Sequence, residues 1–252
     1  MSALARGDLD RGYLLMHQAL EENRRATGSA IPNTPARAFV SLDHAKVDPA
    51  FRGWLLDQAG LLDSLLQSYR ATHSRLLDLD GFARRFLGAR AATEATFLFA
   101  YALARLVRLS RLPRFALSGG FASQLELGLI FDVVLVLDAA LALKNPSPSV
   151  GFKSHAVFLS GTAKLSLTDD ELGEANGRFK CAFDTTLADA LRTSFAPKGR
   201  ALSPLERSIV VSYGLRNRGA HSVASVPALW ERFEDVKQCV FDSLFLAVET
   251  LY

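Results

Sequence analysis

Apolar residues recur every three or four positions along most of the chain, and this period constrains the fold more than any other feature. A helix turns once in about 3.6 residues, so such spacing places apolar side chains on one face. Almost no segment alternates apolar and polar residues as a half-buried strand does. The sequence therefore predicts an all-α fold, a helical bundle. The clearest stripe lies in the C-terminal segment and consists of Trp230, Phe233, Val236, Val240, Leu244, Val248 and Leu251.

Capping residues, prolines and glycines divide this pattern into helices. Asp48-Pro49 and Ser203-Pro204-Leu205-Glu206 are strong start signals, each with a capping side chain followed by proline in the first turn. Pro32 and Pro35 argue against a helix in the turn-rich stretch 28–37. The proline- and glycine-containing segment 145–167 is expected to be a loop. The expected helices span residues 9–25, 49–73, 80–87, 91–112, 121–144, 168–195, 204–219 and 228–252.

Composition and length exclude several other classes of protein. The chain has 252 residues and is 49% apolar, enough for a sizeable core in one large domain or two small ones. Cys181 and Cys239 lie far apart, which argues against a disulfide scaffold and a cysteine zinc site. The N-terminus does not resemble a signal peptide, and Asp132 and Asp138 interrupt the longest apolar stretch. We expect a cytoplasmic protein that does not associate with a membrane.

The sequence lacks the common motifs for phosphate, dinucleotide or metal binding. It has no G-x-x-x-x-G-K-[ST], no strand-associated G-x-G-x-x-G, no H-E-x-x-H and no G-x-S-x-G. Its five histidines do not pair at metal-ligand spacing, so we expect neither a metal nor a cofactor. One constellation remains, Arg216-Asn217-Arg218-Gly219-Ala220-His221.

This constellation lies between two strongly apolar helices. Arg216 continues the apolar stripe of the helix before it, an unfavourable position for a fully solvated arginine. In an unbroken helix, residues five apart point about 140° from each other. Gly219 offers a place for the helix to end, so that His221 can turn back toward Arg216. The stripe consists of Leu205, Ile209 and Tyr213.

Residues 216–221 resemble the R-φ-x-x-x-H signature of the HEPN superfamily, in which φ is a polar residue. HEPN domains are bundles of about four helices with the motif before the last core helix, and residues 118–252 supply four expected helices in that order. The resemblance covers this half of the chain. It implies a HEPN-like bundle over residues 116–252. Residues 1–115 form an N-terminal helical region outside the resemblance, and because such an enzyme must be restrained, our hypothesis is that this region regulates it or binds a partner protein.

The resemblance also implies a metal-independent endoribonuclease that cuts RNA by attack of the 2′-hydroxyl at a homodimer interface. His221 would transfer the proton, Arg216 would hold the phosphate, and Asn217 would orient one of them. Such domains often serve as toxins or antiviral-defence effectors. Further RNA contacts are expected near the motif, from Arg218, Arg207, Arg200 and Lys198.

Other interpretations of the same residues remain open. The bundle could be a non-catalytic module that binds RNA, nucleotide or a partner protein, or a structural subunit with Arg216 in an interface ion pair. Arginine supplies 22 of the 29 basic residues, which suits phosphate binding but is better explained by a GC-rich codon bias. The run Arg105, Arg108, Arg111 and Arg114 is better explained by the dipole at a helix C-terminus than by an RNA track.

Overall fold

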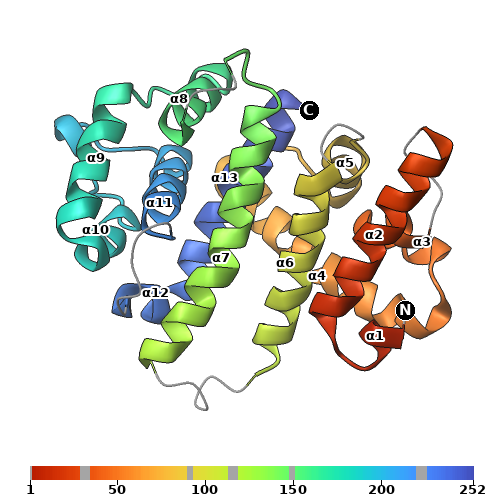
Figure 1. Cartoon of the computed structure of the whole chain (residues 1–252). Helices are drawn as coiled ribbons and strands as arrows, with labels where there is room; N and C mark the ends of the chain where they lie inside the picture. Colours follow the sequence, from red (N-terminus) through yellow and green to blue (C-terminus); the bar gives the residue numbers. More distant parts are fainter. Residues whose placement is uncertain (1, 29–34, 90–92, 113–118, 148–150, 220–225) are drawn as a thin grey trace.

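The computed structural model describes residues 2–28, 35–89, 93–112, 119–147, 151–219 and 226–252 (Figure 1). Within these ranges the regular structure is helical, without strands, which confirms the all-α prediction. The helices are α1 (Ser2–Ala5), α2 (Leu9–Thr27), α3 (Pro35–Val40), α4 (Pro49–His73), α5 (Leu79–Phe82), α6 (Thr93–Ser110), α7 (Gly119–Ala142), α8 (Phe152–Thr162), α9 (Asp169–Cys181), α10 (Phe183–Ala190), α11 (Pro204–Gly219), α12 (Pro227–Glu231) and α13 (Phe233–Leu251). A π-helical turn, η2 (Ala83–Leu87), follows α5, and short 3₁₀ turns lie at η1 (His44–Lys46) and η5 (Pro197–Gly199).

The helix starts follow the capping signals of the sequence. The Asp48 side chain accepts a hydrogen bond from the Ala50 N–H at 2.9 Å and begins α4. Ser203 and Glu206 form the expected reciprocal pair at the start of α11, where Glu206 accepts from the Ser203 N–H at 2.8 Å. Gly28 ends α2 with a left-handed φ of 68°, a conformation that favours glycine.

Two expectations about prolines are wrong. Residues 145–167 are not all loop, because α8 occupies Phe152–Thr162, Gly161 included, with Phe152, Ala156 and Leu159 buried at helical spacing. Helix α3 begins at Pro35, which the first turn of a helix accommodates. In both places the proline limits where a helix begins and does not prevent one.

Two helices expected to be continuous are interrupted. The expected helix 168–195 breaks at Ala182, where φ is −148°, into α9 and α10. The last helix breaks at Arg232, with φ of −124°, into α12 and α13. One contact joins the segments: the Asp184 side chain in the first turn of α10 accepts a hydrogen bond at 2.7 Å from the Ala228 N–H at the start of α12. Tertiary contacts of this kind are not visible in local sequence.

The long helix α7 lies in the middle of the molecule (Figure 1). It packs against α6, α11, α12 and α13, while α2, α3 and α4 lie on the side of α6. The buried side chains form one cluster that extends from Leu4 to Val248. The expected boundary between residues 1–115 and 116–252 falls in 113–118, outside the described residues, and helices on either side of it share this core. None of the described helices is long and apolar enough to cross a membrane.

Candidate functional site at the end of α11

The expected motif begins in the last turn of α11. Arg216, Asn217 and Arg218 are each half-buried there, at the junction of α11 with α7 on one side and with α9 and α10 on the other. His221 lies outside the described residues, so its return toward Arg216 stays a prediction. Of the three described motif residues, Arg216 faces α7, whereas Asn217 and Arg218 face a pocket.

Arg216 faces α7. Its Nε lies 3.5 Å from Oδ2 of Asp138, and its side chain is 37% exposed while that of Asp138 is 21% exposed. A guanidinium in this position is held at the edge of the core and still reaches solvent. An incoming phosphate can therefore approach Arg216, in competition with the Asp138 carboxylate.

His155 contributes to the same cluster from α8. It belongs to the segment 145–167, for which the sequence predicted a loop, but it lies on a helix and is only 2% exposed. Asn145 fixes its tautomer: the Asn145 Oδ1 accepts from the Ser147 N–H at 2.9 Å, so its Nδ2 donates to the His155 Nδ1 at 3.0 Å. The proton of neutral His155 is therefore on Nε2, which lies 4.0 Å from Oδ1 of Asp138.

Asn217 and Arg218 face a pocket of about 400 Å³ between α9, α10 and α11. The Asn217 Nδ2 donates to Oδ1 of Asn176 at 2.8 Å. The Arg218 guanidinium lies 5.1 Å from the ring centroid of Phe183, within the range of a cation–π contact. The aromatic residues of the lining are Phe179, Phe183 and Tyr213.

The pocket is cationic. Arg218 and Lys180 both line it, and its described lining includes no carboxylate. The Arg218 Nε is buried and has no hydrogen-bond partner among the described residues. A buried donor without a partner costs about 1–3 kcal/mol.

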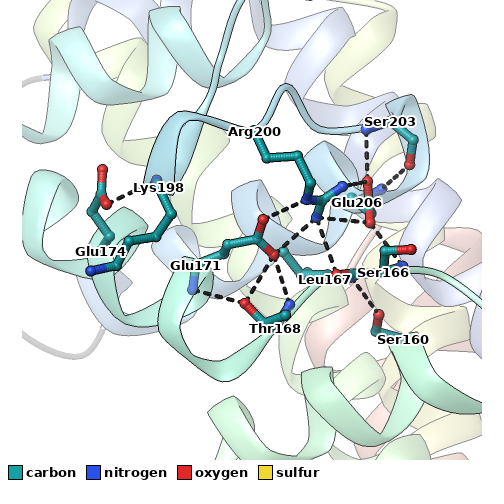
Figure 2. A network of polar contacts seen from close by, with 10 residues as sticks. All are labelled: Ser160, Ser166, Leu167, Thr168, Glu171, Glu174, Lys198, Arg200, Ser203 and Glu206. Carbon is teal, nitrogen blue, oxygen red and sulfur yellow. Dashed lines mark hydrogen bonds and ion pairs between the residues drawn. The ribbon is translucent and has the colours of Figure 1, made fainter.

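Arg200, expected to bind RNA, lies at the centre of a different network (Figure 2). Its guanidinium donates to Glu171 at 2.5 Å and to Glu206 at 3.1 Å. The hydrogen bond from Arg200 lowers the pKa of Glu171 to about 2. For Glu206, burial raises the pKa, but the hydrogen bonds from Arg200 and Ser203 outweigh it and lower the pKa overall. The charge of Arg200 is thus matched within the protein, and its contact with RNA stays a prediction.

Arg207 and Lys198 also lie near the start of α11, away from the motif. Arg207 donates to the Leu202 carbonyl at 3.0 Å. Lys198 has an exposed side chain, a left-handed φ of 54°, and a main-chain N–H that donates to Glu174 at 2.9 Å (Figure 2). Because a helix rises about 1.5 Å per residue, Arg207 lies about 13 Å from Arg216 along the axis. Of the four expected RNA contacts, Arg218 is the one that lines the pocket.

The arginine run at and just beyond the C-terminal end of α6 serves helix packing. Arg105 pairs with Asp132 of α7 at 2.7 Å, Arg111 pairs with Asp57 of α4, and Arg108 donates to the Gly7 carbonyl at 3.1 Å. Arg114 lies outside the described residues. These contacts join α6 to its neighbours, an explanation that the sequence alone had not supplied.

Three residues of this region, Asp138, Asn145 and Asn176, were not predicted to belong to the site. For Asp138 the sequence does contain an indication, since a carboxylate within an apolar helix needs a partner. For the two asparagines the sequence contains no such indication.

Comparison with protein-family models, with curated proteins and with solved structures finds no match. The described residues contain no group of three or more His, Cys, Asp or Glu side chains placed to hold a metal ion.

Proposed function

We propose that the chain is a metal-independent endoribonuclease of the HEPN type, with Arg216, Asn217 and His221 as its catalytic residues. The observation that supports this most strongly is the position of Arg216. It is half-buried at the end of α11, held by Asp138 at 3.5 Å and next to a cationic pocket lined by Asn217 and Arg218. A phosphodiester of RNA matches these donors, since guanidinium groups bind phosphate through charge-assisted hydrogen bonds.

In the proposed reaction, the 2′-hydroxyl of the RNA attacks the adjacent phosphorus. The new O2′–P bond forms as the P–O5′ bond breaks, which leaves a 2′,3′-cyclic phosphate and a free 5′-hydroxyl. His221 takes the hydroxyl proton or gives one to the leaving oxygen, a role suited to a side chain with an ordinary pKa of about 6.5. Arg216 offsets the charge that develops on the phosphate, and Asn217 orients the phosphate or the histidine.

The proposal extends to assembly and biological role. Residues 116–252 would form a HEPN-like four-helix core, with α7, α11 and α13, which pack against one another, as three of its helices. Two protomers would pair so that both motifs line one cleft. A nuclease of this kind would act in the cytoplasm as a toxin or antiviral-defence effector and would need restraint. Residues 1–115 would supply that restraint or bind a regulatory protein.

The test is cleavage of a labelled single-stranded RNA by the full chain in EDTA. We expect cleavage with a cyclic phosphate product, and its loss in His221→Ala and Arg216→Ala. The matched controls are His44→Ala and Arg192→Ala, which remove an exposed histidine and an exposed arginine elsewhere. Cleavage that persists in both motif variants would overturn the assignment. Light scattering measures the dimer, and a monomeric active enzyme would contradict the shared cleft.

The Arg216–Asp138 ion pair also favours a second candidate function, a non-catalytic module that binds RNA. In that case Arg216 stays paired with Asp138, and the pocket alone contacts the ligand. Tight binding of RNA by the wild-type chain, without cleavage in either the presence or absence of EDTA, would favour this candidate.

A further inference from the structure

We infer that the pocket between α9, α10 and α11 binds one unpaired nucleotide of the RNA, with the base against the aromatic wall and the phosphate beside Arg218. This inference rests on the proposed function for its choice of RNA as the ligand. It adds a specificity site to that function, because a nucleotide reaches such a pocket only when its base is unpaired and unstacked.

The size of the pocket suits a nucleotide. Small-molecule pockets usually enclose about 300–1,000 Å³, and this one measures about 400 Å³. Phe179 and Phe183 form a tilted pair with centroids 5.3 Å apart, and Tyr213 completes the apolar part of the lining. The guanidinium of Arg218 lies over Phe183, and guanidinium planes and aromatic rings are the two surfaces on which proteins stack unpaired bases.

An amide pair provides polar recognition beside this wall. The hydrogen bond from Asn217 to Asn176 uses one donor of Asn217 and one acceptor of Asn176. By the inventory of an amide group, the NH₂ of Asn176 and the carbonyl of Asn217 can still contact a ligand. A donor and an acceptor side by side complement the edge of a base, which also carries donors and acceptors side by side.

The charge of the pocket selects an anion. Several arginines of the described structure, including Arg178, Arg192 and Arg200, lie against carboxylates. Arg218 instead has a buried Nε without a hydrogen-bond partner among the described residues, and Lys180 lies on the same lining. A phosphate group in the pocket would offset the charge of both cations. A neutral aromatic ligand would satisfy neither cation.

Asn217 lines the pocket and directly follows Arg216 in the last turn of α11, but the Arg216 guanidinium faces Asp138 of α7 and not the pocket. An RNA strand that contacts both would therefore pass around the end of α11. The pocket would select single-stranded over duplex RNA, because only an unpaired base can enter it.

The test measures RNA binding separately from cleavage. Fluorescence anisotropy with a labelled single-stranded RNA 12-mer, and with the same strand in a blunt duplex, is measured on the full chain carrying His221→Ala. Arg218→Ala and Asn176→Asp are then added, and circular dichroism verifies that each variant folds. Arg192→Ala and Asn23→Asp are the matched controls, since they make the same changes away from the pocket.

We expect both pocket variants to weaken single-strand binding about tenfold, the controls to stay within about twofold, and the duplex to bind more weakly than the single strand. Equal binding by the pocket variants and the controls would overturn the inference, as would absence of single-strand binding. The two proposals fail separately. Cleavage that depends on His221 together with unaffected pocket variants refutes only the pocket, whereas pocket-dependent binding without cleavage refutes only the nuclease.

Discussion

Consecutive residues at the end of α11 have different environments because each step along a helix rotates the side chain by about 100°. Arg216 therefore contacts Asp138 on one side while Arg218 reaches the pocket on the other. The His155 Nε2 on α8 lies 4.0 Å from the same carboxylate. We therefore expect Asp138 to control how strongly Arg216 attracts an anion.

Asp138→Asn is expected to increase RNA affinity about 3- to 10-fold, because it removes a negative charge that competes with phosphate for Arg216 and keeps the size of the side chain. Anisotropy in the His221→Ala background measures the effect. Asp132→Asn is the matched control. Asp132 is also a carboxylate of α7 that is paired with an arginine, but its partner is Arg105 of α6 and not Arg216. Equal changes in the two variants, or weaker binding in Asp138→Asn, would contradict this role.

The sequence predicted part of this region. Arg216, Asn217 and Arg218 could be selected because they are adjacent in the chain and end a helix with a clear start signal. Asp138 and His155 could not, since their contacts join α7, α8 and α11, and no local pattern reports which helices meet. The prolines before His155 also favoured a loop in the prediction, so its place on a buried helix face was not expected.

Among the elements, α9 and α11 are joined at their starts by Arg200 (Figure 2). Glu171 closes the capping box of α9, Glu206 closes that of α11, and Arg200 bonds both carboxylates. The sequence predicted the cap of α11, because a cap needs residues only three positions apart, and it predicted that a helix begins at residue 168. It did not predict the connection between them, which depends on the path of residues 191–203.

Glu171→Gln is expected to lower the free energy of unfolding at pH 7 by about 1–3 kcal/mol, since it removes a charge-assisted hydrogen bond. The folded-state pKa of Glu171 is about 2, below its ordinary value of 4.5. Its stabilising effect is therefore complete above pH 4.5 and is lost as the pH falls toward 2.

Urea unfolding at pH 7, 4.5 and 3 tests this expectation. The difference between wild type and Glu171→Gln should narrow on acidification. Glu22→Gln on the exposed surface of α2 serves as the control and should differ little from wild type at any pH. A difference that is constant between pH 7 and 3 would rule out the Arg200 contact as its source.

The close approach of α9 and α11 depends on Gly214. A Cβ added there would lie 2.6 Å from the ring of Phe179, which also lines the pocket. Gly214→Ala is expected to destabilise the fold by about 1–3 kcal/mol through this clash and to weaken single-strand binding. Gly177→Ala, on the same helix as Phe179 with open space around its Cβ, should be neutral or stabilising. Thermal unfolding of both variants measures the contrast, and equal behaviour would argue against tight packing at Gly214.

At the scale of the whole molecule, the two halves of the sequence share one core. His73 of α4 lies 2.8 Å from Asp242 of α13, and both side chains are almost fully buried. The Tyr69 hydroxyl donates to Glu249 at 2.8 Å, and burial raises the pKa of that hydroxyl. Glu249 also accepts from the main-chain N–H groups of Leu76 and Leu77. Regulation by residues 1–115 would thus act through packed helices, not through a separate module on a linker.

We therefore expect the chain to unfold in one cooperative transition. The two tryptophans provide a reporter in each half: Trp54 of α4 packs against Phe39 with ring centroids 5.7 Å apart, and Trp230 lies in α12. In Trp54→Phe, Trp230 is the one remaining fluorescent tryptophan, and in Trp230→Phe it is Trp54. In urea, each remaining signal should give the same midpoint as circular dichroism of the same variant, because unfolding α4 exposes the buried face of α13. Two midpoints separated within one variant would show that residues 1–115 unfold independently, and would favour a regulatory region that detaches over one that acts through the shared core.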